Sequence, residues 1–259
     1  MKLGLEGRNA IVCGASKGLG YGCAAALAAA DADVTIVART RATLDEAVGA
    51  LQNAGKGRVQ AVAADVTTPQ GRAAVLEACP QPAVLVTNAG GPSPGDFREW
   101  GREEWLAALD ANMLAPIELI KATIDPMAEA GFGRIVNITS HMVKEPVGLL
   151  GLSNGARSGL TGFVAGLARD VAASGVTINN LLPGQFDTGR LRSNHEKFGA
   201  RMGIDAEVVR ERAMGQIPAR RFGRPEEFGA ACAFLCSESG GFITGQNILM
   251  DGGQYRGLL

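Results

Sequence analysis

Apolar residues along the chain cluster into short runs, separated by longer segments in which apolar positions recur with helical periodicity. Each run is rich in valine, isoleucine or leucine and is nearly continuous, which is typical of strands covered on both faces of a sheet. The pattern predicts strands at residues 9–13, 33–38, 59–63, 83–88, 134–138, 176–182 and 248–250. It predicts helices at residues 18–30, 41–53, 68–79, 103–129, 153–174 and 225–237.

This alternation of strands and helices determines the expected fold class. Strand–helix–strand units form parallel sheets through right-handed crossovers, so we expect an α/β protein with a Rossmann-type doubly wound parallel sheet. No Ser/Pro-rich or single-sign stretch interrupts the apolar segments, so residues 1–259 are expected to form a single domain. Ligands should gather at the carboxyl ends of the strands.

Composition narrows the expected partners and compartment. The net charge of −1 argues against nucleic acid as a partner, and no apolar run approaches the roughly 20 residues needed to span a membrane. The five cysteines form no C-x-x-C pair, and the N-terminus lacks the apolar core of a signal peptide. We therefore expect reduced thiols, a cytoplasmic protein and no metal site. Cys232 and Cys236 are expected to be core side chains.

A glycine-rich turn follows the first expected strand and runs directly into a helix. Its spacing, G-x-x-x-G-x-G, lets the backbone turn tightly and approach a pyrophosphate, which then rests on the positive end of the helix. A purely structural turn is the alternative. The residues expected to bind a dinucleotide here are Gly14, Ser16, Lys17, Gly18, Leu19 and Gly20.

The end of the second expected strand favours NADP over NAD. Ala38 supplies no carboxylate for a ribose 2′-hydroxyl, whereas Arg39 offers a planar guanidinium suited to a 2′-phosphate. Lys17, in the glycine turn, adds a second positive charge. Two solvated surface cations are the alternative, and we predict NADP as the cofactor.

From the glycine turn onward, the sequence resembles the short-chain dehydrogenase/reductase family, in particular its 3-oxoacyl-carrier-protein reductases, along almost its whole length. It differs at Cys13, where the family often has threonine. The resemblance implies a homo-oligomer, commonly a tetramer, with a dimer as the alternative. It also implies further cofactor-binding residues: Asp65 and Val66 at the adenine, Asn88, Ala89 and Gly90 beside the cofactor, and Pro183, Gly184 and Thr188 near the nicotinamide.

The catalytic pattern of the family is broken in this chain. The resemblance implies Ser140 as the catalytic serine and Asn112 as the catalytic asparagine, but the tyrosine and lysine positions hold Ser153 and Arg157. A phenol, with an ordinary pKa of about 10, is far more acidic than a serine hydroxyl. Arginine stays protonated near neutral pH and cannot donate a proton productively. The chain therefore resembles a divergent subgroup that lacks the catalytic Tyr and Lys.

Two functions fit this pattern. The first is an NADP-dependent oxidoreductase acting on a carbonyl or hydroxyl substrate, with Ser140, Asn112 and Ser153 assisted by a water or by a loop donor such as His141 or Lys144. The second is an NADP-binding protein without oxidoreductase activity, either a redox sensor or a non-catalytic subunit. Retention of the glycine turn fits both functions.

Residues 188–224 are expected to form a lid over the substrate. The segment carries nine Lys/Arg and four Asp/Glu, an excess of cations within a nearly neutral chain. This excess favours an anionic small-molecule substrate or an acyl thioester on a carrier. A solvated amphipathic lid is the alternative. His195, in the same segment, is expected to lie on the surface.

Overall fold

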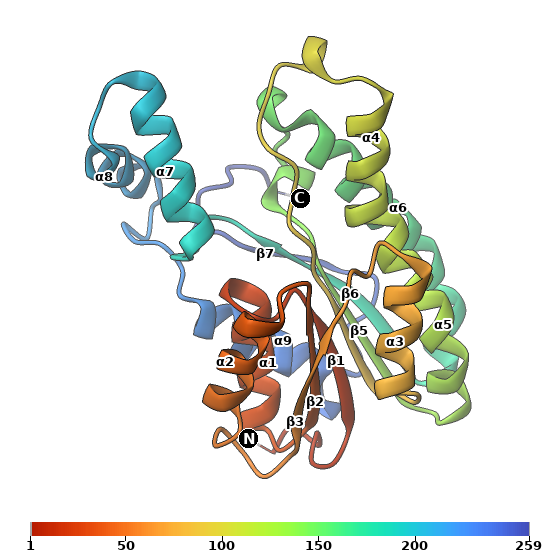
Figure 1. The fold of residues 1–259 in the computed structure, drawn as a ribbon. Helices are drawn as coiled ribbons and strands as arrows, with labels where there is room; N and C mark the ends of the chain where they lie inside the picture. The colour runs from red at the N-terminus through yellow and green to blue at the C-terminus, as the bar shows by residue number, and fades with distance from the viewer. Residues whose placement is uncertain (1, 259) are drawn as a thin grey trace.

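The computed structural model of the chain describes residues 2–258. Within this range, seven parallel strands form one sheet in the order β3-β2-β1-β4-β5-β6-β7 (Figure 1). The strand order reverses between β1 and β4, which confirms the doubly wound Rossmann-type fold. The strands are β1 (Asn9–Cys13), β2 (Asp33–Ala38), β3 (Val59–Ala63), β4 (Val84–Thr87), β5 (Gly133–Ile138), β6 (Val176–Pro183) and β7 (Asn247–Met250).

Helices cover both faces of this sheet. They are α1 (Gly18–Ala29), α2 (Arg41–Leu51), α3 (Pro69–Ala78), α4 (Arg102–Leu109), α5 (Ala115–Glu129), α6 (Gly151–Val171), α7 (Gly189–Met202), α8 (Ala206–Gln216) and α9 (Pro225–Cys236). Helices α1, α2 and α9 pack on one face, while α3, α5 and α6 pack on the other (Figure 1). Helices α7 and α8 stand apart from both layers, beyond the end of β6.

Most expected elements agree closely with the structure, and three features differ. The expected helix at 103–129 is divided into α4 and α5 by a π-helical turn at Asp110–Leu114. The prediction that every strand is covered on both faces is wrong for β3, where Gln60 and Ala63 are exposed because β3 is an edge strand. Helices α7 and α8 were not predicted as helices, because their sequences are strongly polar and were interpreted only as part of the lid at 188–224.

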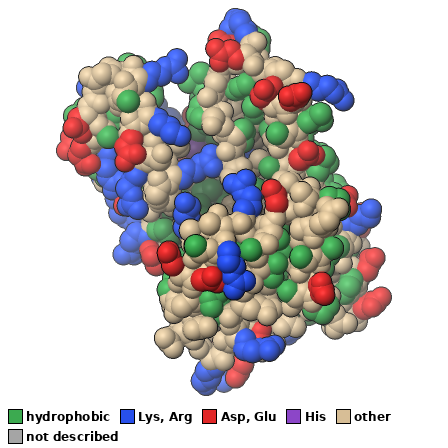
Figure 2. Space-filling view, in the orientation of Figure 1, with side chains coloured by type: hydrophobic (Ala, Val, Ile, Leu, Met, Phe, Trp, Pro, Cys, Tyr) green, Lys and Arg blue, Asp and Glu red, His purple; other side chains and the backbone are tan. Residues whose placement is uncertain are grey.

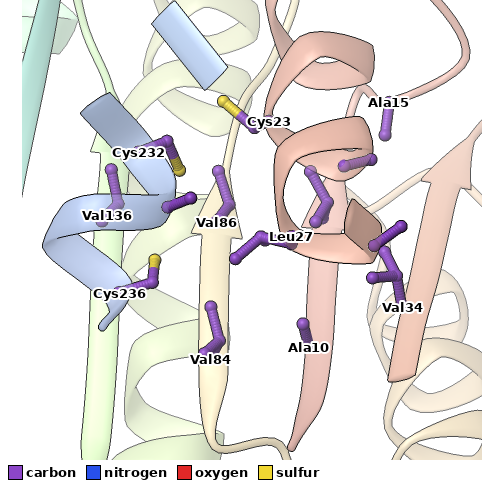
Figure 3. Packing of buried hydrophobic residues seen from close by; sticks show 14 of the residues in the cluster. Ala10, Ala15, Cys23, Leu27, Val34, Val84, Val86, Val136, Cys232 and Cys236 are labelled. Carbon is purple, nitrogen blue, oxygen red and sulfur yellow. The ribbon is translucent and has the colours of Figure 1, made fainter. Parts of the chain in front are cut away.

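The core contains one apolar cluster on each face of the sheet. Figure 3 shows Cys23 of α1 together with Cys232 and Cys236 of α9 inside the cluster on the face covered by α1, α2 and α9. This confirms the expected burial of Cys232 and Cys236. A hydrogen bond to Cys232 and burial raise the pKa of the Cys236 thiol well above its ordinary value, so it stays protonated at neutral pH. In the described part of the chain, no cluster of side chains could hold a metal ion and no helix could span a membrane.

Candidate active site

A cavity of about 570 Å³ opens at the carboxyl ends of the central strands. Figure 2 shows the surface hollowed here, with Lys and Arg side chains around the hollow. Of the residues expected from the sequence, the cavity is lined by Gly14, Lys17, Gly18, Leu19, Asn88, Ala89, Gly90, Ser140, Ser153, Arg157, Pro183, Gly184 and Thr188. The expected residues outside its walls are Ser16, Gly20, Arg39, Asp65, Val66 and Asn112.

The glycine turn brings the start of α1 against the end of β1. Gly14 and Gly18 have φ values of 58° and 65°, a region that side chains rarely adopt. A Cβ atom on Gly20 would meet the carbonyl of Gly14, so only glycine allows this approach. The Asn88 amide, at the end of β4, donates to the Gly14 carbonyl at 3.2 Å and holds the turn in place.

The N-terminus of α1 is open to a ligand. Its N-cap residue, Lys17, makes no side-chain cap, and the first turn holds no acidic residue. The first backbone N–H groups of a helix have no intrahelical acceptor, and the helix dipole favours an anion beside them. This end of the cavity can therefore hold a pyrophosphate.

Arg39 and Asp65 lie side by side outside the cavity, at the ends of the paired strands β2 and β3. Arg39 is exposed and forms no ion pair in the described part of the chain. Hydrogen bonds from the Thr67 hydroxyl and backbone N–H lower the pKa of the Asp65 carboxyl, and the Arg39 charge lowers it further. The place and the charge of Arg39 fit a phosphate at the adenosine end of a dinucleotide.

Ser153 and Arg157 lie one turn apart on the inner face of α6. Arg157 is only 8% exposed, and its Nε donates to the Ser153 hydroxyl oxygen at 3.3 Å. Its Nη1 donates to the Ile138 carbonyl at 2.8 Å, and its Nη2 donates to the Ala89 carbonyl at 3.3 Å. Burial, together with the charge of Arg190, lowers the pKa of Arg157 to about 10. The guanidinium therefore remains charged at neutral pH while it joins α6 to the ends of β4 and β5.

Ser140 and His141 follow β5 and line the same cavity. The Ser140 hydroxyl oxygen accepts the Met142 N–H at 3.2 Å, so its own proton stays available to a ligand. His141 Nδ1 lies 3.0 Å from the Pro183 carbonyl, and it carries the proton because a carbonyl can only accept. Lys144 does not line the cavity; its Nζ lies 5.7 Å from the centre of the Tyr255 ring.

Asn112 is buried in the π-helical turn between α4 and α5 and does not line the cavity. Its side-chain amide donates to the Ala108 carbonyl at 3.3 Å. Its Oδ1 is buried and has no hydrogen-bond partner among the residues described. Such π-helical turns occur frequently at functional sites, and a buried amide oxygen of this kind is suited to bind a water.

Most of the cations in the lid segment do not face the cavity. Arg192 and Arg210 pair with Asp187, and Arg221 and Arg224 pair with Glu227. Of the nine cationic side chains, Arg190 alone lines the cavity in the described structure. Four of the nine cations of the segment are therefore paired with carboxylates away from the cavity.

The expectation that His195 lies on the surface is wrong. His195 is 7% exposed, and its ring lies 5.7 Å from the ring of Phe222, because α7 packs this face against the loop after α8. Burial lowers its pKa.

Another residue was not expected at the site at all: Gln254, from the tail after β7, lines the cavity with a buried Oε1 that lacks a partner in the described chain. No local sequence signal connects that tail to the site.

The chain is similar to known proteins along nearly its whole length. The family described as Enoyl-(Acyl carrier protein) reductase matches residues 14–254 of the chain. A 3-oxoacyl-(acyl-carrier-protein) reductase from Vibrio cholerae is 32% identical over 259 residues and covers 98% of this chain and 99% of that protein. An acetoacetyl-CoA reductase from Rhizobium meliloti is 34% identical over 254 residues, which are 96% of this chain and 98% of that protein. The solved structure of L-sorbose reductase from Gluconobacter frateurii, complexed with NADPH and L-sorbose, has a TM-score of 0.94 at 28% identity and covers 100% of both chains.

Proposed function

Because the chain belongs to the short-chain dehydrogenase/reductase family, we propose that it is an NADPH-dependent reductase of a carbonyl compound. When bound, NADPH would supply a hydride to the carbonyl carbon, and the carbonyl oxygen would take up one proton to give the alcohol. The observation that carries this proposal is that the glycine turn and the hydroxyls of Ser140 and Ser153 open into one cavity. A dinucleotide held by the turn would present its reactive end to both hydroxyls.

The cofactor is assigned to residues that line the cavity and to residues of the glycine turn and the ends of β2 and β3 outside its walls. The open N-terminus of α1 receives the pyrophosphate, while Arg39 and Lys17 pair with the 2′-phosphate. NADPH in the related L-sorbose reductase supports the choice of NADP. The remaining cofactor contacts are assigned to Gly14, Ser16, Gly18, Leu19, Gly20, Asp65, Val66, Asn88, Ala89, Gly90, Pro183, Gly184 and Thr188.

The proton is proposed to come from a water rather than from a phenol. Neither of the two tyrosines of the chain, Tyr21 and Tyr255, lines the cavity. The hydroxyls of Ser140 and Ser153 hold the carbonyl oxygen, and the unpartnered Oδ1 of Asn112 holds the water behind them. Without a phenol, reduction should be slow, because general acid catalysis typically contributes about 10²–10⁴ in rate.

An NADP-binding protein without oxidoreductase activity is the second candidate. The contacts of Arg157 favour it, because two of its hydrogen bonds join α6 to the backbone carbonyls of Ile138 and Ala89 and a third goes to Ser153 of the same helix, as in a purely structural residue. In this case the site would bind NADP as a sensor or as part of a non-catalytic subunit.

The substrate of the favoured function is proposed to be an acyl thioester or another anionic ketone.

Turnover of NADPH with a panel of ketones, oxo acids and acyl thioesters tests the choice. We expect slow oxidation of NADPH in which Ser140→Ala lowers kcat about 10²-fold or more, while fluorescence titration gives an unchanged NADPH affinity. Ser158→Ala, at an exposed position of α6, is the matched control. If no compound is reduced although NADPH binds tightly, the non-catalytic function is correct. If Ser140→Ala and Ser153→Ala both leave kcat unchanged, the proposed proton route is wrong.

A further inference from the structure

Two guanidinium groups converge on one wall of the cavity without a carboxylate partner. Arg157 reaches this wall from α6 and Arg190 from the start of α7, where its Nη2 donates to the Gly91 carbonyl at 2.9 Å. Neither arginine forms an ion pair within the described residues, although four other arginines near the lid are paired with Asp187 or Glu227. Buried cations are normally paired, so an unpaired one beside a second cation indicates a site for an anion.

The space in front of Gly91 is where the two groups meet. A Cβ atom built on Gly91 would lie 3.3 Å from Arg190 Nη2, 3.6 Å from Arg157 Nη2 and 3.8 Å from the Ser153 hydroxyl oxygen. Both guanidiniums and the Ser153 hydroxyl therefore border the side of Gly91 that carries no side chain, and an acceptor bound in the cavity in front of Gly91 would face these three groups. The glycine leaves the space open, since any other residue would direct its own side chain into it.

Arg157 also has donors to spare for such a ligand. A guanidinium carries five N–H groups, and the contacts of Arg157 to Ser153, Ile138 and Ala89 use three of them. These contacts orient the planar group, so its remaining donors meet an anion with little further loss of side-chain freedom. Charge-assisted bonds from arginine to a carboxylate are among the strongest in proteins.

We propose that Arg157 and Arg190 bind the carboxylate of the substrate, which identifies the substrate as a small oxo acid. This inference rests on the proposed function. The position beside Ser153 places the anion within a few bonds of the reacting carbonyl. The phosphate groups of an acyl carrier or coenzyme A lie at the far end of a long pantetheine arm, so they cannot reach this point while the carbonyl reacts. The chain would thus differ in substrate from its 3-oxoacyl and acetoacetyl-CoA relatives.

Paired substrates provide the kinetic test. NADPH oxidation is measured with 2-oxobutanoate, 3-oxobutanoate and 4-oxopentanoate, each beside its methyl ester, and with acetoacetyl-CoA. We expect at least one acid to exceed its ester in kcat/KM by about ten- to a hundredfold. Arg190→Gln should remove that difference by lowering the value for the acid alone. Arg192→Gln, two residues along α7 at an exposed position paired with Asp187, is the control and should change neither value.

Binding without turnover separates this inference from the proposed function. Butanoate and pentanoate, which cannot be reduced, are titrated calorimetrically into the protein saturated with NADP⁺. We expect millimolar or tighter binding that Arg190→Gln weakens by about tenfold or more. Binding of this kind without reduction of any oxo acid would support the carboxylate site and refute the reductase. Two results would overturn the carboxylate site. The first is an absence of carboxylate binding. The second is a kcat/KM for the esters or acetoacetyl-CoA that equals the value for the acids and does not change in Arg190→Gln.

Discussion

Restoring the family's catalytic pair tests the account of the active site most directly. The double change Ser153→Tyr and Arg157→Lys introduces a phenol with a lysine one helical turn away, at positions that line the cavity. A lysine near the ring lowers the pKa of the phenol and lets it donate a proton near neutral pH. Since the wild-type chain has no phenol in the cavity, we expect kcat to rise by about 10²-fold, at the lower end of the range for general acid catalysis.

The change also has a cost that the structure defines. Arg157 donates to the Ile138 and Ala89 carbonyls and to Ser153. A lysine ammonium has three donors and can keep the hydrogen bonds to the two carbonyls. One charge-assisted hydrogen bond is lost, which lowers the free energy of unfolding by about 1.5–3 kcal/mol. Thermal unfolding should therefore shift down by several degrees, which leaves the protein folded at 25 °C.

The assay compares kcat at saturating substrate, because Arg157→Lys also weakens the proposed carboxylate site. The matched control is Ser153→Phe with Arg157→Lys, which has the same ring and no hydroxyl. The reasoning is refuted if the Phe variant is as active as the Tyr variant. It is equally refuted if the Tyr variant folds, binds NADPH and shows no gain in kcat.

Three further outcomes are expected. Arg39→Ala should weaken NADPH binding about tenfold and leave NADH nearly unchanged, because an exposed guanidinium pairs only with the 2′-phosphate; equal losses in calorimetry would contradict this. Gly20→Ala should weaken the binding of both NADPH and NADH in the same titration and lower the unfolding temperature, since its Cβ would meet the Gly14 carbonyl. Unchanged affinity would argue against cofactor binding at the glycine turn. Glu227 has a pKa lowered to about 2 by Arg221 and the Arg224 backbone. Its contribution to stability is present above the ordinary value of 4.5 and is lost towards pH 2, so the unfolding temperatures of wild type and Glu227→Gln should converge over that interval.

Much of the fold could be predicted because its signals are local. The apolar runs at β1 and β2 give the observed bounds directly, and the glycine spacing after β1 marks the start of α1. The departures at Ser153 and Arg157 were also visible, since the flanking sequence keeps the register of α6. A resemblance to a family carries such position-by-position expectations only where the spacing of the motif is preserved.

The errors arose where long-range packing decides. His195 lies in a polar segment, and its burial depends on Phe222, which is 27 residues away in the sequence. The segment 188–224 is basic by its own composition, but Asp187 and Glu227, which lie just outside it in the sequence, pair with four of its nine cations. The edge position of β3 likewise follows from the order of strands in the sheet and not from its own residues.

The sequence by itself determined the parallel doubly wound sheet, the glycine turn at the start of α1 and the presence of Ser153 and Arg157 one turn apart on α6. Each of these depends on residue types at short, regular spacing, which backbone geometry converts directly into structure. Only the tertiary structure decided which charges face the cavity. Arg157 and Arg190 are 33 residues apart and come together in front of Gly91 because the N-terminal parts of α6 and α7 both lie beside the cavity at the carboxyl ends of the strands. Among residues 2–258, neither arginine has a carboxylate partner, which is a property of that three-dimensional arrangement and is encoded by no local pattern.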